Sequence, residues 1–341
     1  MAHRKAKITT GKIRYLILVC VLLTGCDKLF IAPNNDFQEQ NIRDFEEIWS
    51  FIDANYPFFE FMEINSEYLY EKYRPLAEQS RGDEIFGVVL NMLAELKDGH
   101  TIFKNEAAGI VDMIPYIMPR MKRDYNRFSP TVTRKYFSTE LFVNGEKNLE
   151  YGITDDNTGY IRISSFTELH SDPRDFDHAL DYLRNTDALI LDLRHNSGGE
   201  ITRIAERFVT STIRIIYYDK YGDSEEEIIN PRGTFIYTKP VVILINGCSV
   251  SGAEFLAAHL QPLPNVTLVG DTTAGLGGSD TEITLSSGKW LSTTRVYSYY
   301  YDRLIQWNGV PPDILVRNTE EEIRRNRDNQ LEFALDYLTG R

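Results

Sequence analysis

The segment from Val241 to Glu254, VVILINGCSVSGAE, constrains the fold of this chain more than any other segment. Its first five residues are apolar and mostly β-branched, which is typical of a buried strand. Asn, Gly and Ser residues then predict a turn, and the following AEFLAAHL has the composition and spacing of a helix. A serine at such a junction lies at the end of a sheet, beside the unpaired N–H groups of the first helical turn. The junction can therefore hold both a nucleophile and donors for an oxyanion.

Strand-like and helix-like segments alternate from Gly159 onwards, which predicts an α/β fold with a mostly parallel sheet covered on both faces. The predicted strands are GYIRISSF, ALILDL, VVILI and VTLVGD, and the predicted helices are RDFDHALDYLRN, ITRIAERFVTST and AEFLAAHL. The segment ITLSSGKWLSTTRVYSYYYD near the end predicts antiparallel hairpin strands.

The first 25 residues have the organisation of a secretion signal. A basic segment precedes an apolar run from Tyr15 to Leu23, and Leu-Thr-Gly comes directly before Cys26. This pattern resembles a bacterial lipoprotein signal, in which Cys26 is acylated and becomes the first residue. An ordinary secretory signal that holds a cysteine is the alternative. We therefore expect a lipid anchor at the cell envelope, on its periplasmic or cell-surface side.

The rest of the chain divides into four predicted parts. They are a tether (residues 26–40), an N-terminal helical domain (41–100), a β-rich connecting region (101–150) and the α/β core (151–341). About 60 residues separate His100 from Gly159, which is too few for a PDZ domain of roughly ninety residues. Peptide capture is therefore expected in the groove of the core itself.

Charge and cysteine content narrow the range of partners. The signal segment carries five Lys or Arg and no acidic residue, which leaves 32 basic against 50 acidic side chains in the mature chain. Such an acidic surface argues against nucleic acid. Cys20 leaves with the signal and Cys26 is the anchor, so Cys248 is alone and is expected to be a small core residue. No Cys/His/carboxylate cluster has ligand spacing, so no metal or cofactor is implied.

Three glycine-bearing turns follow predicted strands, namely HNSGGE at 195–200, NGCSVSG at 246–252 and GDTTAGLGG at 270–278. The carboxyl ends of parallel strands meet at the edge of the sheet where ligands bind. A fourth signal, His100 in LKDGHT, lies upstream between the helical and β-rich regions. These four segments are the candidate functional loops.

Six motifs in order carry a family resemblance: L-K-D-G-H-T, G-Y-I-R-I-S-S-F, L-D-L-R-H-N-S-G-G, S-V-S-G-A-E, G-D-T-T-A-G and G-V-P-P-D. Together they resemble the tail-specific (C-terminal processing) and tricorn-core serine peptidases of the S41 type. They run from about residue 90 to residue 315. The resemblance implies a ClpP/crotonase-like core and serine peptidase activity.

The resemblance also implies the catalytic roles. The family nucleophile lies three residues before the acidic residue of its S-x-S-x-x-E turn, so Glu254 selects Ser251. Ser249 is the other candidate serine, and its position also suits a turn former. His100 is the implied general base, because a neutral imidazole can accept the serine proton near neutral pH.

The implied oxyanion donors are the N–H of Gly252 together with that of Gly198 or Gly199. Both glycines of the 198–199 pair also suit a tight turn that needs positive φ. His195 is a second histidine at the same predicted edge, and we expect it to shape the loop or to line the substrate groove.

The chain departs from both catalytic patterns of the family. Tail-specific members use a lysine at the position of Leu276, and the next lysine after Ser251, Lys289, lies in a predicted hairpin turn. Tricorn-type members have a serine where this chain has Gly99, and a glutamate where it has Gln306. Gln306 remains a candidate catalytic residue, because its amide can orient another residue, although it cannot stabilise an imidazolium by charge. Asp98 is the alternative carboxylate, and its position also suits a loop cap.

We therefore predict a membrane-anchored serine endopeptidase that acts through Ser251 and His100. The alternative is a catalytically inactive member that binds peptide or an apolar ligand, which Gly99 and Gln306 favour. A thioester-handling crotonase relative is a further alternative, and the secretion signal argues against it. Four tyrosines near the end of the predicted hairpin either form an aromatic wall of the groove or pack the core. They are Tyr297, Tyr299, Tyr300 and Tyr301.

Overall fold

The computed structural model describes residues 35–105 and 109–341, so the predicted signal peptide and Cys26 lie outside the described residues. The first described helix, α1 (Asn35–Asn55), begins inside the segment predicted as a tether, which is therefore helical from residue 35 onwards. Within the described ranges, no helix is both long enough and apolar enough to cross a membrane.

A seven-stranded sheet forms the centre of the α/β core, in the order β15-β10-β9-β6-β5-β4-β3. The five strands from β15 to β5 run parallel, and β4 and β3 are antiparallel additions at one edge. The sheet is therefore mostly parallel, as predicted. The strands are β3 (Phe142–Val143), β4 (Leu149–Ile153), β5 (Thr158–Ile163), β6 (Ala188–Asp192), β9 (Val241–Ile245), β10 (Val266–Gly270) and β15 (Ile314–Leu315).

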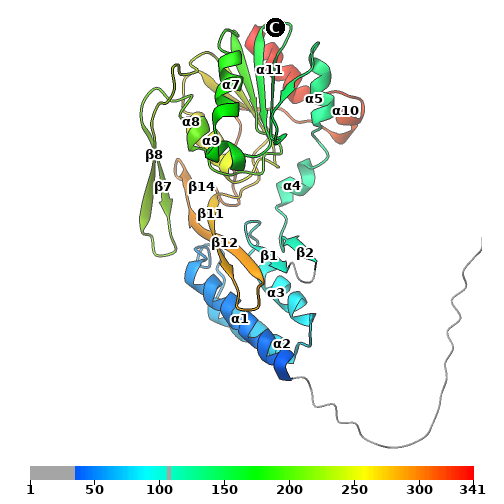
Figure 1. Cartoon of the computed structure of the whole chain (residues 1–341), viewed down its shortest axis with the longest axis vertical. Coiled ribbons are helices and arrows are strands. Elements are labelled where there is room, and N and C mark those ends of the chain that lie inside the picture. Colours follow the sequence, from blue (N-terminus) through cyan, green and yellow to red (C-terminus); the bar gives the residue numbers. More distant parts are fainter. Residues whose placement is uncertain (1–34, 106–108) are drawn as a thin grey trace, which may run out of the picture. The chain divides into compact units, whose positions relative to one another are not determined.

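Both faces of this sheet are buried at its centre, which explains why strands such as β6 and β9 are almost continuous apolar runs. Along β9, Ile243 and Ile245 pack into the same core as helices α7 (Arg174–Tyr182), α8 (Thr202–Ala205) and α9 (Gly252–Leu260). The alternate residues Val242 and Leu244 pack with Leu331 of helix α11 (Asn329–Thr339) on the other face. Figure 1 shows α11 on one side of the sheet and α7 on the other.

A second sheet has the order β2-β1-β12-β7-β8, with β11 paired to the other side of β12. The β11–β12 hairpin agrees with the sequence prediction, whereas the β7–β8 hairpin was not predicted. It follows directly after α8, a helix of four residues where twelve were predicted. The strands are β1 (Ile102–Asn105), β2 (Ile110–Met113), β7 (Ile213–Tyr218), β8 (Ser224–Ile229), β11 (Gly278–Thr284) and β12 (Trp290–Tyr297), with β13 (Tyr299–Tyr300) and β14 (Arg303–Leu304) forming a separate pair.

The N-terminal helices share a hydrophobic core with the second sheet. Phe45 and Ile48 of α1 belong to the same buried cluster as Leu291 and Tyr297 of β12. Helices α2 (Ser66–Gln79) and α3 (Glu84–Ala94) complete this cluster. The helices and these strands bury one another, and the domain boundary at residue 100 stays a prediction.

The region 101–150 contains helices as well as strands, so the prediction of a β-rich segment describes only part of it. Helix α4 (Pro119–Asp124), helix α5 (Pro130–Thr133) and the 3₁₀ helix η2 (Arg134–Tyr136) lie between β2 and β3. The remaining short helices are α6 (Thr167–Ser171) and α10 (Glu320–Arg324).

A fully buried arginine joins the carboxyl end of β6 to the start of α11. The Arg194 guanidinium lies 2.6 Å from the Asp192 carboxylate and 2.7 Å from that of Asp328. It also stacks on the Phe128 ring at 4.3 Å. Burial by itself raises the pKa of Asp328, but the Arg194 charge outweighs this effect, and the pKa lies below its usual value.

We expect Arg194→Met to lower the free energy of unfolding at neutral pH by about 3–5 kcal/mol, because it leaves two buried carboxylates without their cation. Urea denaturation measures the change. The difference from the parent should shrink as the pH falls through the lowered pKa of Asp328, since protonated carboxyls no longer need the charge. Arg174→Met, at an exposed pair with Asp172, is the control and should leave the midpoint unchanged. An unchanged midpoint for Arg194→Met would contradict the account.

Candidate active site

Ser251 lies in the turn between β9 and α9, directly before the first residue of the helix. Its backbone has φ 53° and ψ −118°, a conformation that residues other than glycine rarely adopt. Ser249, the other candidate, is fully buried. Its hydroxyl donates to the Leu193 carbonyl at 2.8 Å and accepts the Asn246 N–H at 3.0 Å. Ser249 therefore forms the turn, and Ser251 is the serine that lines a cavity.

Glu254 holds this turn in place from the first turn of α9. Its carboxylate is fully buried and accepts the Ser251 N–H at 3.1 Å. It also accepts the N–H groups of Gly275 and Leu276 at 2.8 and 2.7 Å, and the Thr273 hydroxyl at 2.6 Å. Burial raises the pKa of Glu254, and the four donors oppose that rise without cancelling it. The carboxylate thus joins the Ser251 turn to the loop at 273–276.

The predicted oxyanion donors do not have equal access to a ligand. Gly198 donates its N–H to the Asn196 side chain at 2.7 Å, so it is not available, and the proposal of Gly198 as a donor is wrong. Gly199 and Gly252 both line the cavity with Ser251. Among the described residues, neither of these two N–H groups has a hydrogen-bond partner. A Cβ on Gly198 would lie 2.7 Å from Ser251 Cβ, so only glycine permits this close approach.

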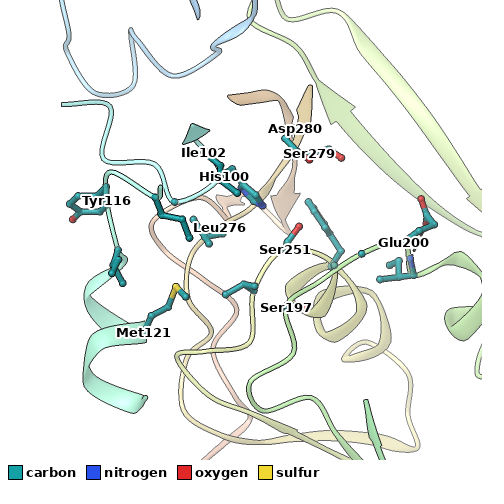
Figure 2. A pocket seen from close by; sticks show the side chains of 18 of the residues that line it. His100, Ile102, Tyr116, Met121, Ser197, Glu200, Ser251, Leu276, Ser279 and Asp280 are labelled. Carbon is teal, nitrogen blue, oxygen red and sulfur yellow. Dashed lines mark hydrogen bonds between the residues drawn. The ribbon is translucent and has the colours of Figure 1, made fainter. Parts of the chain in front are cut away.

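His100 enters the same cavity from the loop that precedes β1 (Figure 2). Its backbone N–H donates to Asp98 at 2.9 Å, and its carbonyl accepts the Ser292 hydroxyl at 3.3 Å. The ring atom Nδ1 is buried and has no hydrogen-bond partner within the described part of the chain. Leaving a buried polar atom unpaired costs about 1–3 kcal/mol, which a bound group or a shift of the ring would relieve.

Gln306 is fully buried, and its side chain bonds to the loop that carries His100 rather than to the His100 ring. Its amide donates to Asp98 at 3.2 Å and accepts the Gly277 N–H at 2.9 Å. Asp98 also accepts the Thr294 hydroxyl at 2.6 Å. Asp98 is therefore the loop cap that the sequence suggested as its alternative role. Gln306 positions Asp98, and through it the main chain of His100, without adding a charge.

The cavity around Ser251 and His100 has a volume of about 590 Å³. One wall, here called the 114–121 wall, consists of apolar and aromatic side chains that the sequence analysis did not identify. The run IVDMIPYIMPRM, with its many apolar residues and no helical period, was the only signal for it. Its members are Ile114, Tyr116, Ile117 and Met121, with Val250 and Leu276 beside them.

Leu276, at the position of the family lysine, lies in this cavity against Gly99. A Cβ on Gly99 would lie 3.0 Å from the Leu276 side chain, so the glycine makes room for the leucine. Lys289 is bound elsewhere, because its ammonium pairs with Asp44 of α1. In the described residues, no group of three or more His, Cys, Asp or Glu side chains could hold a metal ion.

Several other predicted residues lie away from the cavity. The ring of His195 packs against Phe128 at 5.1 Å, and burial lowers the pKa of His195, so this residue shapes its loop. Cys248 is buried, and burial raises the pKa of its thiol to about 12. None of the four tyrosines lines the cavity, so of the two alternatives core packing holds for Tyr297 and Tyr299, which lie in the cluster shared by the N-terminal helices and the second sheet. Tyr300 and Tyr301 line a separate hollow.

We expect Gln306→Glu, which introduces the family residue type, to destabilise this chain. Its carboxylate would replace an amide that lies 3.2 Å from Asp98, and both side chains are fully buried. Two carboxylates this close cannot both ionise, so one pKa is raised. When the pKa of a carboxyl group is higher in the folded than in the unfolded state, the folded state loses stability as the pH rises through that higher pKa. The free energy of unfolding should therefore fall, relative to the parent, between about pH 5 and pH 8.

The matched control for this variant is Gln261→Glu, because Gln261 donates to Asp313 at 2.6 Å in an exposed position. Solvent screens that pair, so little pH dependence is expected. Chemical denaturation at several pH values measures both variants. Parallel pH curves for Gln306→Glu and the parent would rule out this account of the Asp98 environment.

Comparisons with known proteins support the resemblance. Residues 157–316 match the model of peptidase family S41, and residues 37–94 match the model of the tricorn protease C1 domain. The carboxyl-terminal-processing protease of Synechocystis sp. is 32% identical over 54% of this chain and 44% of its own length. The carboxy-terminal processing protease CtpA of Bacillus subtilis is 32% identical over 40% of this chain and 32% of its own length. The chain thus spans less than half the length of either relative.

The crystal structure of a proposed peptidase from Parabacteroides merdae has the same fold over most of its length. It is 26% identical, with a TM-score of 0.72, and the match covers 87% of this chain and 96% of that one. The match to the S41 model includes the turn of Ser251, the 198–199 loop and Gln306. The S41 match covers 160 of the 341 residues, and the tricorn-type match covers a separate segment at the N-terminal helices. Residues 157–316 therefore match peptidase family S41, a family of serine peptidases, and carry the turn of Ser251 within that match.

Proposed function

We propose that this protein is an endopeptidase that cleaves peptides or proteins through an acyl-enzyme formed on Ser251, with His100 as the general base. The observation that carries the proposal is that one cavity is lined by Ser251, His100, Gly199 and Gly252. These residues come from segments that lie far apart in the sequence. Together they supply a hydroxyl, a base and two N–H groups, which are the parts that acyl transfer needs.

The proposed reaction follows from these groups. The Ser251 hydroxyl attacks the scissile carbonyl while His100 accepts its proton, and His100 then protonates the leaving amine. The N–H groups of Gly199 and Gly252 stabilise the oxyanion, and losing one such donor typically costs about 3 kcal/mol. Water activated by His100 then hydrolyses the acyl-enzyme and releases Ser251.

We propose that the enzyme acts outside the cytoplasm while anchored by lipid at Cys26. The support lies in the first 26 residues, where a basic segment, an apolar run and Leu-Thr-Gly precede the cysteine. Acyl chains each add about 0.8 kcal/mol of membrane affinity per buried CH₂. Metabolic labelling with a fatty-acid analogue tests the anchor, and a label that persists in Cys26→Ser would exclude acylation at Cys26.

An inactive, ligand-binding member of the family is the second candidate function. The observation that favours it is the position of Gln306, which is neutral and bonds to Asp98 and Gly277. The imidazolium that forms on His100 during the reaction therefore gains no charge stabilisation from this position. A cavity with an apolar wall also suits binding without chemistry.

A fluorophosphonate probe discriminates between the two functions, because only an activated serine forms the adduct. We expect labelling of the parent, no labelling of Ser251→Ala, and labelling slowed by about 10⁴-fold or more in His100→Ala. Ser197→Ala is the matched control, since Ser197 lines the same cavity and should leave labelling intact. Labelling that persists in Ser251→Ala would contradict the proposed nucleophile, and a parent without any label would favour the binding function.

A further inference from the structure

The cavity differs in chemistry on the two sides of Ser251. Figure 2 shows Tyr116 and Met121 on one side of Ser251 and Glu200 on the opposite side. The first side is the apolar 114–121 wall. The second side, here called the Glu200 subsite, is lined by Glu200, Ile201, Tyr217 and Phe255. A peptide that crosses Ser251 therefore meets an apolar surface on one side and a carboxylate on the other.

Two aromatic rings form the floor of the Glu200 subsite. Tyr217 of β7 and Phe255 of α9 meet edge to face, with ring centroids 5.4 Å apart and planes at 71°. Phe255 is buried in the main core, so its ring has a fixed position. Aromatic faces bind the methylene stem and the cationic head of Lys or Arg side chains. A rigid aromatic floor beside a carboxylate thus suits a long basic side chain.

A second carboxylate, Glu227 of β8, stands behind this floor. It accepts the Tyr217 hydroxyl at 3.0 Å, and the Thr202 hydroxyl bonds to it as well. The same Thr202 hydroxyl lies 2.7 Å from Glu200, so the two carboxylates meet at one threonine. Burial raises the pKa of Glu227, and the charge of Glu200 raises it further. A cation that enters the subsite would be attracted by both carboxylates.

The described residues that line the cavity include Glu200 and Asp280 but no lysine or arginine. A substrate carboxylate there would meet like charge, which disfavours its binding. A separate observation also points to a ligand in this cavity, because the buried Nδ1 of His100 has no partner in the described structure. The charge of the lining therefore favours a cationic substrate group.

We propose that the Glu200 subsite selects a Lys or Arg side chain beside the cleaved peptide bond, while the 114–121 wall takes an apolar residue on the other side. This inference rests on the proposed peptidase function. The cationic head of the selected side chain forms charge-assisted hydrogen bonds with Glu200, and its stem lies on Tyr217 and Phe255. The substrates are then proteins or peptides with a basic residue next to an apolar one.

The test uses N-acetylated, internally quenched peptides that differ at one position, which is Lys, Arg, norleucine or Glu. Acetylation removes the terminal ammonium, so only a side chain supplies the cation. We expect kcat/KM to be at least about tenfold higher for Lys and Arg than for norleucine, and lowest for Glu. A parallel set with free amino termini should show the same ranking. If the ranking depends on the free amino group, the selected cation is the terminus and the proposal is overturned.

Two variants assign the preference to the subsite. Glu200→Gln should lower the ratio of kcat/KM for Lys over norleucine by about tenfold, while the norleucine peptide reports any general damage to the site. Glu226→Gln is the matched control, because Glu226 is adjacent in β8 and pairs with Arg214 on the exposed hairpin. It should leave the ratio unchanged. Equal cleavage of the Lys and norleucine peptides by the parent overturns this inference alone, whereas cleavage of no peptide by the parent contradicts the proposed function itself.

Discussion

The candidate site depends on one buried carboxylate, that of Glu254. Ser251 has a backbone conformation that few L-residues adopt, so neighbouring contacts must hold it there. Glu254 does this by accepting the Ser251 N–H while it also accepts donors from Thr273, Gly275 and Leu276. Four donors offset much of the cost of burying a carboxylate, and the same contacts fix the loop that carries Leu276 into the cavity. Removing the Glu254 carboxylate would therefore release both the Ser251 turn and the loop that carries Leu276.

The cavity lies where the two sheets meet. Ser251 follows β9 of the parallel sheet, whereas His100 precedes β1 of the second sheet. Asp280, which also lines the cavity, belongs to β11 of that second sheet. The geometry of nucleophile and base is therefore set by how firmly the sheets pack together, and not by either sheet alone. Gln306 contributes to this packing, because its amide bonds to Asp98 beside His100 and to Gly277 at the start of β11. A neutral amide suits a position that must accept one N–H and donate to one carboxylate.

Much of this arrangement follows from local sequence patterns, and the rest does not. The strands of the parallel sheet are predictable, because burial on both faces leaves continuous apolar runs such as VVILI. The β7–β8 hairpin was missed because its SEEEII strand is largely exposed and has no apolar face to reveal it. The choice of Gly199 over Gly198 required coordinates, since it depends on one hydrogen bond that the Gly198 N–H donates to the Asn196 side chain. The 114–121 wall could not be predicted either, because an irregular segment has no hydrophobic periodicity that shows which of its side chains face a cavity.

The departures from the family pattern are physically coupled. Replacing the family lysine by Leu276 places an apolar side chain beside the catalytic loop, and a side chain at position 99 would crowd it. Glycine at 99 removes that conflict, so the serine of the tricorn-type pattern and Leu276 would compete for the same space. Leu276 also packs with Met118 and Ala274, which extends the apolar wall beside the His100 loop. Apolar surroundings strengthen the electrostatic interactions of the buried groups next to them. The substitutions at positions 99 and 276 thus replace polar groups of the family pattern with an apolar contact beside His100.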